Sequence, residues 1–469
     1  MLKSEQVVHN IAVLIENGTL QSHTKLPSLR AYAQQTGFSV VTIFSAYQRL
    51  EALGLVYAKE KSGFFVAAQA SMAKQTDVQA VEVTSKVQVN SRVFQYLKAL
   101  TQYTHASLGS AFPDPDVLGN SRLMNTIARN AKYRKSYYSG DAMPPGNATL
   151  RQFIAHKYTL QGIPTQADDI VITSGALDAL NLSLQVLTTP GDYILLQSTV
   201  FYGAWQLAEK FGLKVITFPS DHEINLDAFE AALKKYPIKV CWLMLNSHNP
   251  IGFTVSQTVK AKIAQLLATY QVYLVEDDVY QELYFGLEKP LPVQYYDQDQ
   301  WVLHCSSFSK VLGAGARIGW VRAGQFSDKI QHQQLMSSLS VNPMLQYALA
   351  EFTATLHYEK HLRQIRSQLA KRKQSFYQNI KAILPESCHI FYYSSGYFLW
   401  IELPKHIDST ALYETLLMHD IVITPSILFQ KHTAKQSHFR VNCSYEWNDR
   451  YSQIFEFISK IIKEWNSVS

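Results

Sequence analysis

The sequence predicts an α/β protein with a winged helix-turn-helix module at its N-terminus and a larger body built on a mostly parallel sheet. Residues 1–67 carry helical periodicity, followed by an alternating apolar and polar pattern around Ser62 and Gly63 that is typical of a two-stranded hairpin. Beyond about residue 92, strand patterns alternate with helix patterns, as expected for a parallel sheet. The stretch between them, "VAAQASMAKQTDVQAVEVTSKVQVNS", has no aromatic residue and little periodicity. We therefore expect three segments: a module over 1–67, a linker over 68–92 and a body over 93–469.

Composition excludes several classes of protein. With 469 residues, 47% hydrophobic and 17% charged, the chain is that of a globular protein of two or three domains. No run of 18 apolar residues is present, and the first residues, "MLKSEQVVHNIAVLIENG", include acidic residues where a signal peptide carries only basic ones, so we expect a cytoplasmic protein without membrane contact. The net charge of +6 indicates only a mild preference for anionic partners. Four widely spaced cysteines, with no metal-binding pattern, are interpreted as reduced core thiols: Cys241, Cys305, Cys388 and Cys443.

The N-terminal module begins with an amphipathic helix, in which Val8, Ile11, Ala12 and Ile15 recur at helical spacing before Gly18. A second helix follows "LPS", and a third begins at Ser39. In the third helix four residues face inward: Ile43, Ala46, Tyr47 and Leu50. Four others are left outside: Ser39, Val40, Thr42 and Arg49. Periodicity alone does not separate a DNA-binding module from a three-helix packing module.

The body repeats a strand, a turn and a helix in "DIVITSGALDALNLSLQVL", "DYILLQSTVFYGAWQLAEKFG", "KVCWLMLNSHNPIGFT" and "VYLVEDDVYQELYF". In open α/β sheets the ligand lies at the carboxyl ends of the strands. The polar residues of interest fall at those ends: Ser174, Gly175, Asn249, Asp277, Tyr280 and residues 307–310. We therefore expect a ligand site at this edge of the sheet.

The residue types at this edge fit the chemistry of pyridoxal 5′-phosphate. A lysine amine forms a Schiff base with an aldehyde, a buried acid keeps a pyridine nitrogen protonated, and a phosphate needs a helix N-terminus and an arginine. We expect Lys310 to carry the cofactor, Asp277 to pair with the ring nitrogen and Phe201 to stack on the ring. Asn249 and Tyr280 are expected to bind the ring hydroxyl. The expected phosphate ligands are Ser174, Gly175, Ala176, Ser307, Ser309 and Arg317.

Each of these residues also has an ordinary interpretation when taken alone. Lys310 would then be a solvated lysine, Asp277 a turn or cap residue and Phe201 a core residue. Arg317 would form a salt bridge only. Taken one residue at a time, the sequence leaves both interpretations open.

The string "LPSLRAYAQQTGFSVVTIFSAYQRLEALGLVYAKEKSGFFV" resembles the DNA-binding domain of the GntR family of bacterial regulators. The resemblance implies that Arg30 and the start of the third helix, with Ser39 and Thr42, bind DNA in the major groove. Where relatives usually have an arginine after the helix-opening residue, this chain has Val40 and then Val41. A valine contacts a thymine methyl group but forms no bidentate pair with guanine. We therefore expect an operator that is rich in A·T pairs or one that is recognised with low sequence specificity. The module carries a net charge of only +2, which predicts modest non-specific affinity.

The motifs SGA, NPIG, DDVY and SSFSK followed by an arginine resemble fold type I pyridoxal-phosphate aminotransferases, in their family order, over roughly residues 105 to 465. The resemblance implies a large domain with a mostly parallel sheet and a smaller α+β C-terminal domain. It assigns Arg440 in "FRVNCS" to the α-carboxylate of a substrate or effector. In "YYSGDAMPPGNATLRQFIA" it favours Tyr138 over Tyr137 as the residue that reaches the phosphate of a neighbouring subunit, which implies a homodimer.

A GntR-type winged helix joined to a fold type I body is similar to the MocR subfamily of bacterial transcription regulators. The leading hypothesis is a regulator that binds a double-stranded DNA operator and senses pyridoxal phosphate or an amino compound through an aldimine. The main alternative is an active aminotransferase acting on an amino acid, with the module secondary. A cofactor-binding scaffold for protein partners is a third hypothesis.

Overall fold

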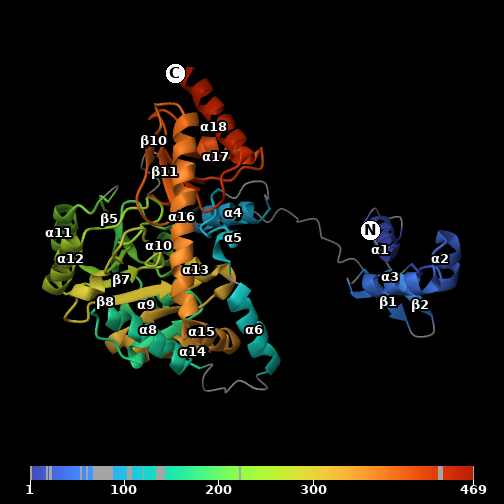
Figure 1. Cartoon of the computed structure of the whole chain (residues 1–469), viewed down its shortest axis with the longest axis horizontal. Coiled ribbons are helices and arrows are strands. Elements are labelled where there is room, and N and C mark those ends of the chain that lie inside the picture. Colours follow the sequence, from blue (N-terminus) through green and yellow to red (C-terminus); the bar gives the residue numbers. More distant parts are fainter. Residues whose placement is uncertain are drawn as a thin grey trace. The chain divides into compact units, whose positions relative to one another are not determined.

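The computed structural model describes residues 3–16, 20, 24–52, 55–59, 62–66, 88–102, 108–119, 121–133, 143–220, 223–430 and 437–467. The chain separates into two compact units, Met1–Val83 and Thr84–Ser469 (Figure 1). The predicted linker lies mostly outside the described residues, and helix α4 begins at Gln88, before the predicted linker end at residue 92. None of the helices in these ranges combines the length and apolar character of a membrane span.

The first unit is a winged helix-turn-helix. Its elements are α1 (Lys3–Glu16), α2 (Leu29–Thr36), α3 (Val40–Ala52), β1 (Val56–Lys59) and β2 (Gly63–Val66). The turn between α2 and α3 is set by Gly37, whose φ of 71° lies in the left-handed region that glycine adopts without strain. Strands β1 and β2 pair antiparallel, with Val56 opposite Val66. The core of the unit includes all four residues predicted to face inward from the third helix: Ile43, Ala46, Tyr47 and Leu50.

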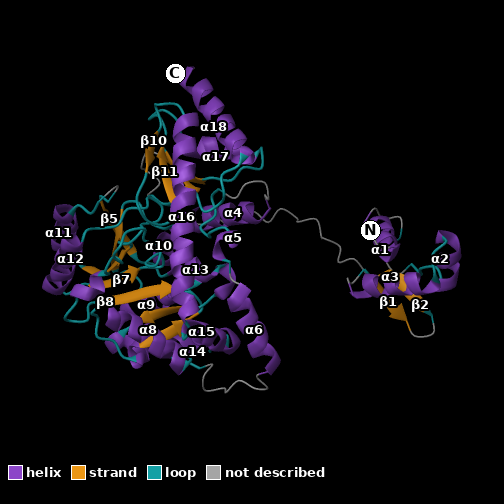
Figure 2. Cartoon of the chain, in the orientation of Figure 1, coloured by secondary structure: helices purple, strands orange, loops and turns teal. Residues whose placement is uncertain are grey.

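The second unit contains a seven-stranded sheet in the order β3-β9-β8-β7-β6-β4-β5. Figure 2 shows strands of this sheet, among them β5, β7 and β8, together with the helices around it. Strand β9 pairs antiparallel with both neighbours, and all other pairs are parallel. The strands are β3 (Ile170–Thr173), β4 (Tyr193–Gln197), β5 (Lys214–Phe218), β6 (Ile238–Leu243), β7 (Tyr273–Asp277), β8 (Val302–Ser307) and β9 (Gly319–Arg322). The predicted mostly parallel sheet is therefore confirmed.

Helices cover both faces of this sheet, which explains why its strands are almost continuously apolar. In strand β7, Val275 packs in the cluster that includes α9, whereas Leu274 packs on the opposite face with residues of α12. The main helices around the sheet are α8 (Ala148–Leu160), α9 (Ala176–Leu187), α10 (Tyr202–Lys210), α11 (Leu226–Lys235), α12 (Gln257–Tyr270), α14 (Ser327–Ser337) and α15 (Pro343–Thr353). Shorter or peripheral elements are α4 (Gln88–Gln102), α5 (Pro115–Leu118), α6 (Ser121–Tyr133), α13 (Ser309–Leu312), and the 3₁₀ turns Ala167–Asp169, Val293–Tyr296, Ala314–Ala316, Gly324–Phe326 and Ser426–Leu428.

A smaller α+β domain completes the body. Its antiparallel sheet has the order β10-β11-β13-β12. The strands are β10 (His389–Phe391), β11 (Phe398–Glu402), β12 (Thr424–Pro425) and β13 (His438–Asn442). The 28-residue helix α16 (Leu356–Ile383) packs against α18 (Asp449–Ser467), and α17 (Ser409–Leu417) lies beside β12. This domain matters for the site because β13 carries Arg440.

All four cysteines are free thiols, as predicted. Cys241, Cys305 and Cys443 are buried, and Cys388 is partly buried. Burial raises the pKa of each of these thiols, so they remain protonated core residues.

Candidate cofactor site

The carboxyl ends of adjacent strands bring the predicted site residues to one edge of the large sheet. Thr173 and Ser307 lie on either side of Gly319 in the sheet register, so the loop after β3 and the loop after β8 start side by side. Asp277 ends β7, directly beside Cys305 of β8. Lys310 then lies in the short helix α13 that follows β8.

Lys310 is held at this edge by its own hydrogen bond and by two aromatic rings. Its Nζ donates to the carbonyl of Ala111 at 2.8 Å and lies 4.2 Å from the ring centroid of Phe112 and 5.5 Å from that of Tyr280. Burial, aided by the positive charge of Arg440, lowers the pKa of Lys310 from 10.5 to about 7. A large fraction of the amine is therefore neutral, and nucleophilic, near neutral pH.

Asp277 is the acid at the centre of the site. Its side chain is 1% exposed, and its Oδ1 has no hydrogen-bond partner among the described residues. Burial and the neighbouring Asp278 raise the pKa of Asp277 to about 7, while Lys310, the backbone N–H of Val279 and the indole of Trp242 act in the opposite direction. A buried carboxylate oxygen without a donor is costly, so this atom fits a ligand that brings a hydrogen-bond donor, such as a protonated ring nitrogen.

Asn249, Tyr280 and Arg440 form a second connected group. Arg440 is fully buried and donates from Nη1 to Asn249 Oδ1 at 2.6 Å and from Nη2 to the carbonyl of Gly109 at 2.6 Å. Asn249 Nδ2 in turn faces the Tyr280 hydroxyl at 3.4 Å. The Nε of Arg440 has no acceptor among the described residues, so the guanidinium keeps a donor for an anionic ligand.

The turn between β3 and α9 forms a corner at which the N-terminus of a helix and an arginine lie close together. Gly175 precedes the first residue of α9 with φ 93°, and Arg317 Nη2 donates to the carbonyl of Ser174 at 2.8 Å. A Cβ atom on Gly175 would lie 2.8 Å from Arg317 Nη2, so only glycine allows the guanidinium this close. The N-terminus of the 12-residue helix α9 and Arg317 both favour a phosphate at this corner.

The hydroxyl groups after β8 lie next to this corner. Ser307 Oγ accepts a hydrogen bond from the backbone N–H of Ser309 at 3.4 Å. Ser309 is 4% exposed, and its own hydroxyl has no partner among the described residues. The Oδ1 of Asp277 and the hydroxyl of Ser309 are therefore two buried polar atoms without hydrogen-bond partners among the described residues. The ring nitrogen and the phosphate of a phosphorylated pyridine would be suitable partners for them.

Two predicted residues are not tied to the site by these contacts. Phe201 caps α10, and its ring lies 4.4 Å from that of Tyr202, so its role as a stacking residue stays a prediction. Tyr138 lies outside the described residues. In the first unit, Arg30 is exposed, and the hydroxyls of Ser39 and Thr42 lie 2.8 Å apart at the start of α3.

The segment before α5 contributes to the site although no sequence motif indicates it. Carbonyls of this segment accept from Lys310, from Arg440 and, at Ala111, from the Tyr397 hydroxyl at 2.8 Å. Backbone carbonyls are present at every residue, so a sequence pattern does not single them out. The only signal is that Gly109 and Ser110 precede two prolines in a stretch without periodicity.

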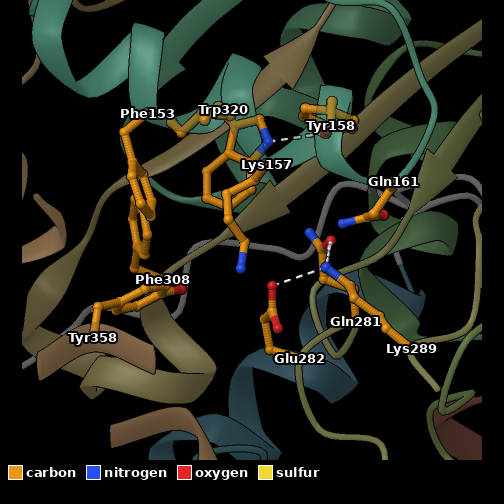
Figure 3. A pocket seen from close by; sticks show the side chains of 11 residues that line it. Phe153, Lys157, Tyr158, Gln161, Gln281, Glu282, Lys289, Phe308, Trp320 and Tyr358 are labelled. Atoms are coloured by element: carbon orange, nitrogen blue, oxygen red, sulfur yellow. Dashed lines mark hydrogen bonds and ion pairs between the residues drawn. The ribbon is translucent and has the colours of Figure 1, made fainter. Parts of the chain in front are cut away.

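A buried polar network lies behind the site. His304 bridges Asp278 Oδ2 at 3.0 Å and the Tyr158 hydroxyl at 2.6 Å, and Trp320 Nε1 donates to that hydroxyl at 3.0 Å. Figure 3 shows Trp320 and Tyr158 at the wall of a small pocket, where Lys289 also contacts Glu282 and Gln281. Because an indole N–H only donates, Tyr158 donates to His304 Nδ1, and His304 Nε2–H donates to Asp278. The network therefore fixes the residue next to Asp277.

We expect His304→Leu to destabilise the body by roughly 2 to 5 kcal/mol, because Asp278 and Tyr158 would each lose a buried partner. The measurement is the midpoint of urea unfolding followed by tryptophan fluorescence. His304→Gln retains one donor and one acceptor and should recover part of the loss. Equal midpoints for the leucine variant and the unmodified protein would contradict the role of this network.

We expect Asp277→Asn to weaken pyridoxal phosphate binding by roughly 1.5 to 3 kcal/mol, the range for a hydrogen bond to a charged group. The measurement is an absorbance titration, with the exposed Asp299→Asn as control.

In the cofactor-free protein, Asp277→Asn should instead increase the stability at neutral pH. Because the pKa of Asp277 is raised on folding, stability falls as pH rises from about 4 to 7, and the asparagine variant should lack this loss. Cofactor affinity equal to that of the unmodified protein would rule out Asp277 as the partner of the ring nitrogen.

Two family models match the chain. Residues 120–450 match the model described as "Aminotransferase class I and II", and residues 3–66 match "Bacterial regulatory proteins, gntR family". The uncharacterised HTH-type transcriptional regulator YdcR of Escherichia coli K12 is 43% identical over 99% of this chain and 100% of its own length. YjiR, described in the same way and from the same strain, is 31% identical over 98% of this chain and 99% of its own length.

Solved aminotransferases share the fold of the body. LysN, the α-aminoadipate aminotransferase of Thermus thermophilus, solved with N-(5′-phosphopyridoxyl)-L-leucine, aligns with a TM-score of 0.74 at 21% identity over 81% of this chain and 98% of its own. The kynurenine aminotransferase of Pyrococcus horikoshii aligns with a TM-score of 0.72 at 24% identity. The alignment covers 84% of this chain and 98% of that enzyme.

The fold and the matched models define a class I and II aminotransferase body fused to a GntR-type winged helix. The chain belongs to the bacterial HTH-type regulators with this fusion, which is the MocR architecture. The predicted fold class and the predicted family are therefore confirmed.

Proposed function

We propose that this protein is a DNA-binding transcription regulator whose body binds pyridoxal 5′-phosphate and senses the cofactor or an amino compound. The observation that carries the proposal is the combination, in one chain, of a winged helix with an exposed recognition helix and a body in which Lys310 and Asp277 lie in one buried site. YdcR and YjiR, which carry the regulator description, resemble the chain along its whole length.

The described residues fit the cofactor. The free Oδ1 of Asp277 suits the ring nitrogen, Lys310 offers a neutral amine, and Arg317 with the α9 N-terminus suits the phosphate. When bound, pyridoxal phosphate supplies an aldehyde and an electron-accepting ring. Lys310 would hold the aldehyde end, and Asp277 would hold the proton on the ring nitrogen. Arg440 would orient the carboxylate of an amino-acid effector through its Nε–H, which has no acceptor among the described residues.

The proposed working form is a cytoplasmic homodimer that presents two winged helices to two half-sites of a DNA operator. Leu177, which follows Ala176 at the start of α9, is 45% exposed, so an apolar side chain borders the phosphate corner. The proposed dimer rests on the resemblance to fold type I aminotransferases, whose sites are built across a two-fold interface, and a neighbouring subunit would then lie beside this position. Sedimentation velocity measures the oligomeric state, and a body that stays monomeric with cofactor bound would argue against this assembly.

A mobility-shift assay with DNA upstream of the gene tests the regulatory function. The full chain should retard a specific fragment, and a chain lacking residues 1–83 should not, although it should still bind pyridoxal phosphate. The cut falls at the boundary between the two compact units, so it leaves α4 intact. Equal retardation by both proteins would place DNA binding in the body and refute the proposal.

Transamination is a second candidate function, favoured by the position of the Lys310 amine at the carboxyl edge of the sheet, where its pKa, lowered by burial to about 7, suits proton transfer at neutral pH. Single-turnover mixing of the loaded protein with amino acids tests it. Conversion of the bound cofactor to pyridoxamine phosphate would establish the activity, and an unchanged spectrum with every amino acid would exclude it for those substrates.

We expect replacement of Arg440 by lysine to weaken amino-acid effectors by roughly 1.5 to 3 kcal/mol, because lysine keeps the charge but lacks the Nε–H that would donate to the carboxylate. Simple amines without a carboxylate should bind almost as before. The measurement is the shift in cofactor absorbance on titration with each ligand. Equal weakening of amino acids and amines would show that Arg440 holds the site together instead, through Asn249 and Gly109.

A further inference from the structure

Helix α3 exposes a continuous stripe of four residues. Val41, Phe44, Ser45 and Gln48 follow the spacing of one helix face and are all exposed. Val41 is 77% exposed and Phe44 is 42% exposed. The opposite face, with Ile43 and Ala46, is buried in the core of the unit, so the stripe is the surface that α3 offers to a partner.

The stripe carries no formal charge. The hydroxyls at the start of α3 are engaged with each other, and Ser39 Oγ also accepts from the backbone N–H of Thr42 at 3.2 Å. At the far end, Arg49 contacts Glu5 at 3.4 Å, on the side of α1. The polar groups left on the stripe are the hydroxyl of Ser45 and the amide of Gln48.

The charged side chains elsewhere on the unit favour an anionic partner. Lys25, Arg30 and Lys59 are exposed, and none of them makes an ion pair within the described residues. Two acids whose side chains the structure describes have partners: Glu5 contacts Arg49, and Glu51 Oε1 accepts from the backbone N–H of Ala58 at 2.9 Å. An apolar stripe on a unit with these cations fits the major groove of duplex DNA, where the second helix of a helix-turn-helix lies.

We propose that α3 reads A·T base pairs, with Val41 and Phe44 against the methyl groups of thymine and Gln48 on the edge of adenine. This inference rests on the proposed DNA-binding function. Valine and phenylalanine make apolar contacts with a thymine methyl, and glutamine pairs with adenine N6 and N7. Guanine is read by arginine or lysine, and the stripe contains neither.

The test uses the full-length protein and a pool of random DNA duplexes. Selection should enrich sites whose helix-facing positions are A·T pairs. In a selected site, each thymine base is then replaced by uracil, which differs from thymine only by the absence of the 5-methyl group. Affinity should fall by about fourfold for each contacted methyl group, the equivalent of one buried methylene.

Variants link the effect to the stripe. Val41→Ala combined with Phe44→Ala should bind thymine and uracil sites equally, and both positions are exposed, so the fold is kept. Leu14→Ala, an exposed apolar residue on α1 (37% exposed), should keep the preference for thymine.

Two results would overturn the inference in distinguishable ways. If the protein selects sites but binds their thymine and uracil forms equally, the base reading is wrong and the DNA-binding function stands. If no duplex is retained even at low salt, the proposed function fails together with it.

Discussion

Replacing Lys310 by alanine is expected to abolish covalent attachment of pyridoxal phosphate completely. Among the described residues of the site, the amine of Lys310 alone combines a position beside Asp277 with a pKa lowered to about 7 by burial. After incubation with pyridoxal phosphate and reduction with borohydride, peptide mass analysis should find the cofactor on the peptide with residue 310 in the unmodified chain and on no peptide of the variant. The phosphate corner should still retain some cofactor noncovalently.

Lys373 provides the comparison within the same chain. It is also fully buried, with its pKa lowered to about 7, but its Nζ donates to the carbonyls of Tyr393 and Ser395. If the reduced cofactor were found on the peptide that contains Lys373, the assignment of Lys310 would be wrong.

The same assignment predicts how attachment depends on pH. Only the neutral amine reacts with an aldehyde. Since the pKa of Lys310 is lowered from 10.5 to about 7, the attachment rate should rise through pH 7 and level off above it. A rate that kept rising toward pH 10 would indicate an ordinary exposed lysine.

The second large effect is expected from Arg30→Ala combined with Thr42→Ala, which should abolish specific DNA binding. Each lost base contact costs about 1 to 3 kcal/mol, and both residues lie in the helix-turn-helix. The cofactor spectrum should be unchanged, because these residues belong to the first compact unit and the cofactor site to the second. Fluorescence anisotropy with a selected duplex measures the DNA affinity.

Lys59→Ala serves as the matched control for this variant. Lys59 is an exposed cation at the end of β1, so its loss should weaken all sequences to a similar degree and reduce the salt dependence. Tight and selective binding by the Arg30 and Thr42 double variant would show that the module reads DNA through other residues.

The fold was readable from the sequence because its elements obey simple periodicities. Ile43, Ala46, Tyr47 and Leu50 follow one helix face and are all buried. The strand of Asp277 is apolar until its last two residues, which is typical of a strand covered on both faces. The linker was predicted to end at residue 92, whereas helix α4 begins at Gln88, because "QVNSRVFQYLKALTQ" opens with residues that are equally common in linkers.

The candidate site was only partly readable. Residues at strand ends, such as Asp277 and Lys310, meet because parallel strands end at one edge of a sheet. The carbonyls of Gly109 and Ala111 and the network of Asp278, His304 and Tyr158 depend on packing between segments far apart in sequence. Local patterns carry no information on such contacts.

Coupling between the proposed cofactor site of the body and the proposed DNA-binding module should appear in the operator affinity measured with and without ligand. Anisotropy titrations of the full-length protein would be run without cofactor, with pyridoxal phosphate, and with pyridoxal phosphate plus each of a panel of amino compounds. At least one ligand state should change the affinity by roughly 5- to 150-fold, the usual range of allosteric coupling, and Lys310→Ala should remove the change. The same affinity in every ligand state, or the same change in Lys310→Ala, would contradict this coupling.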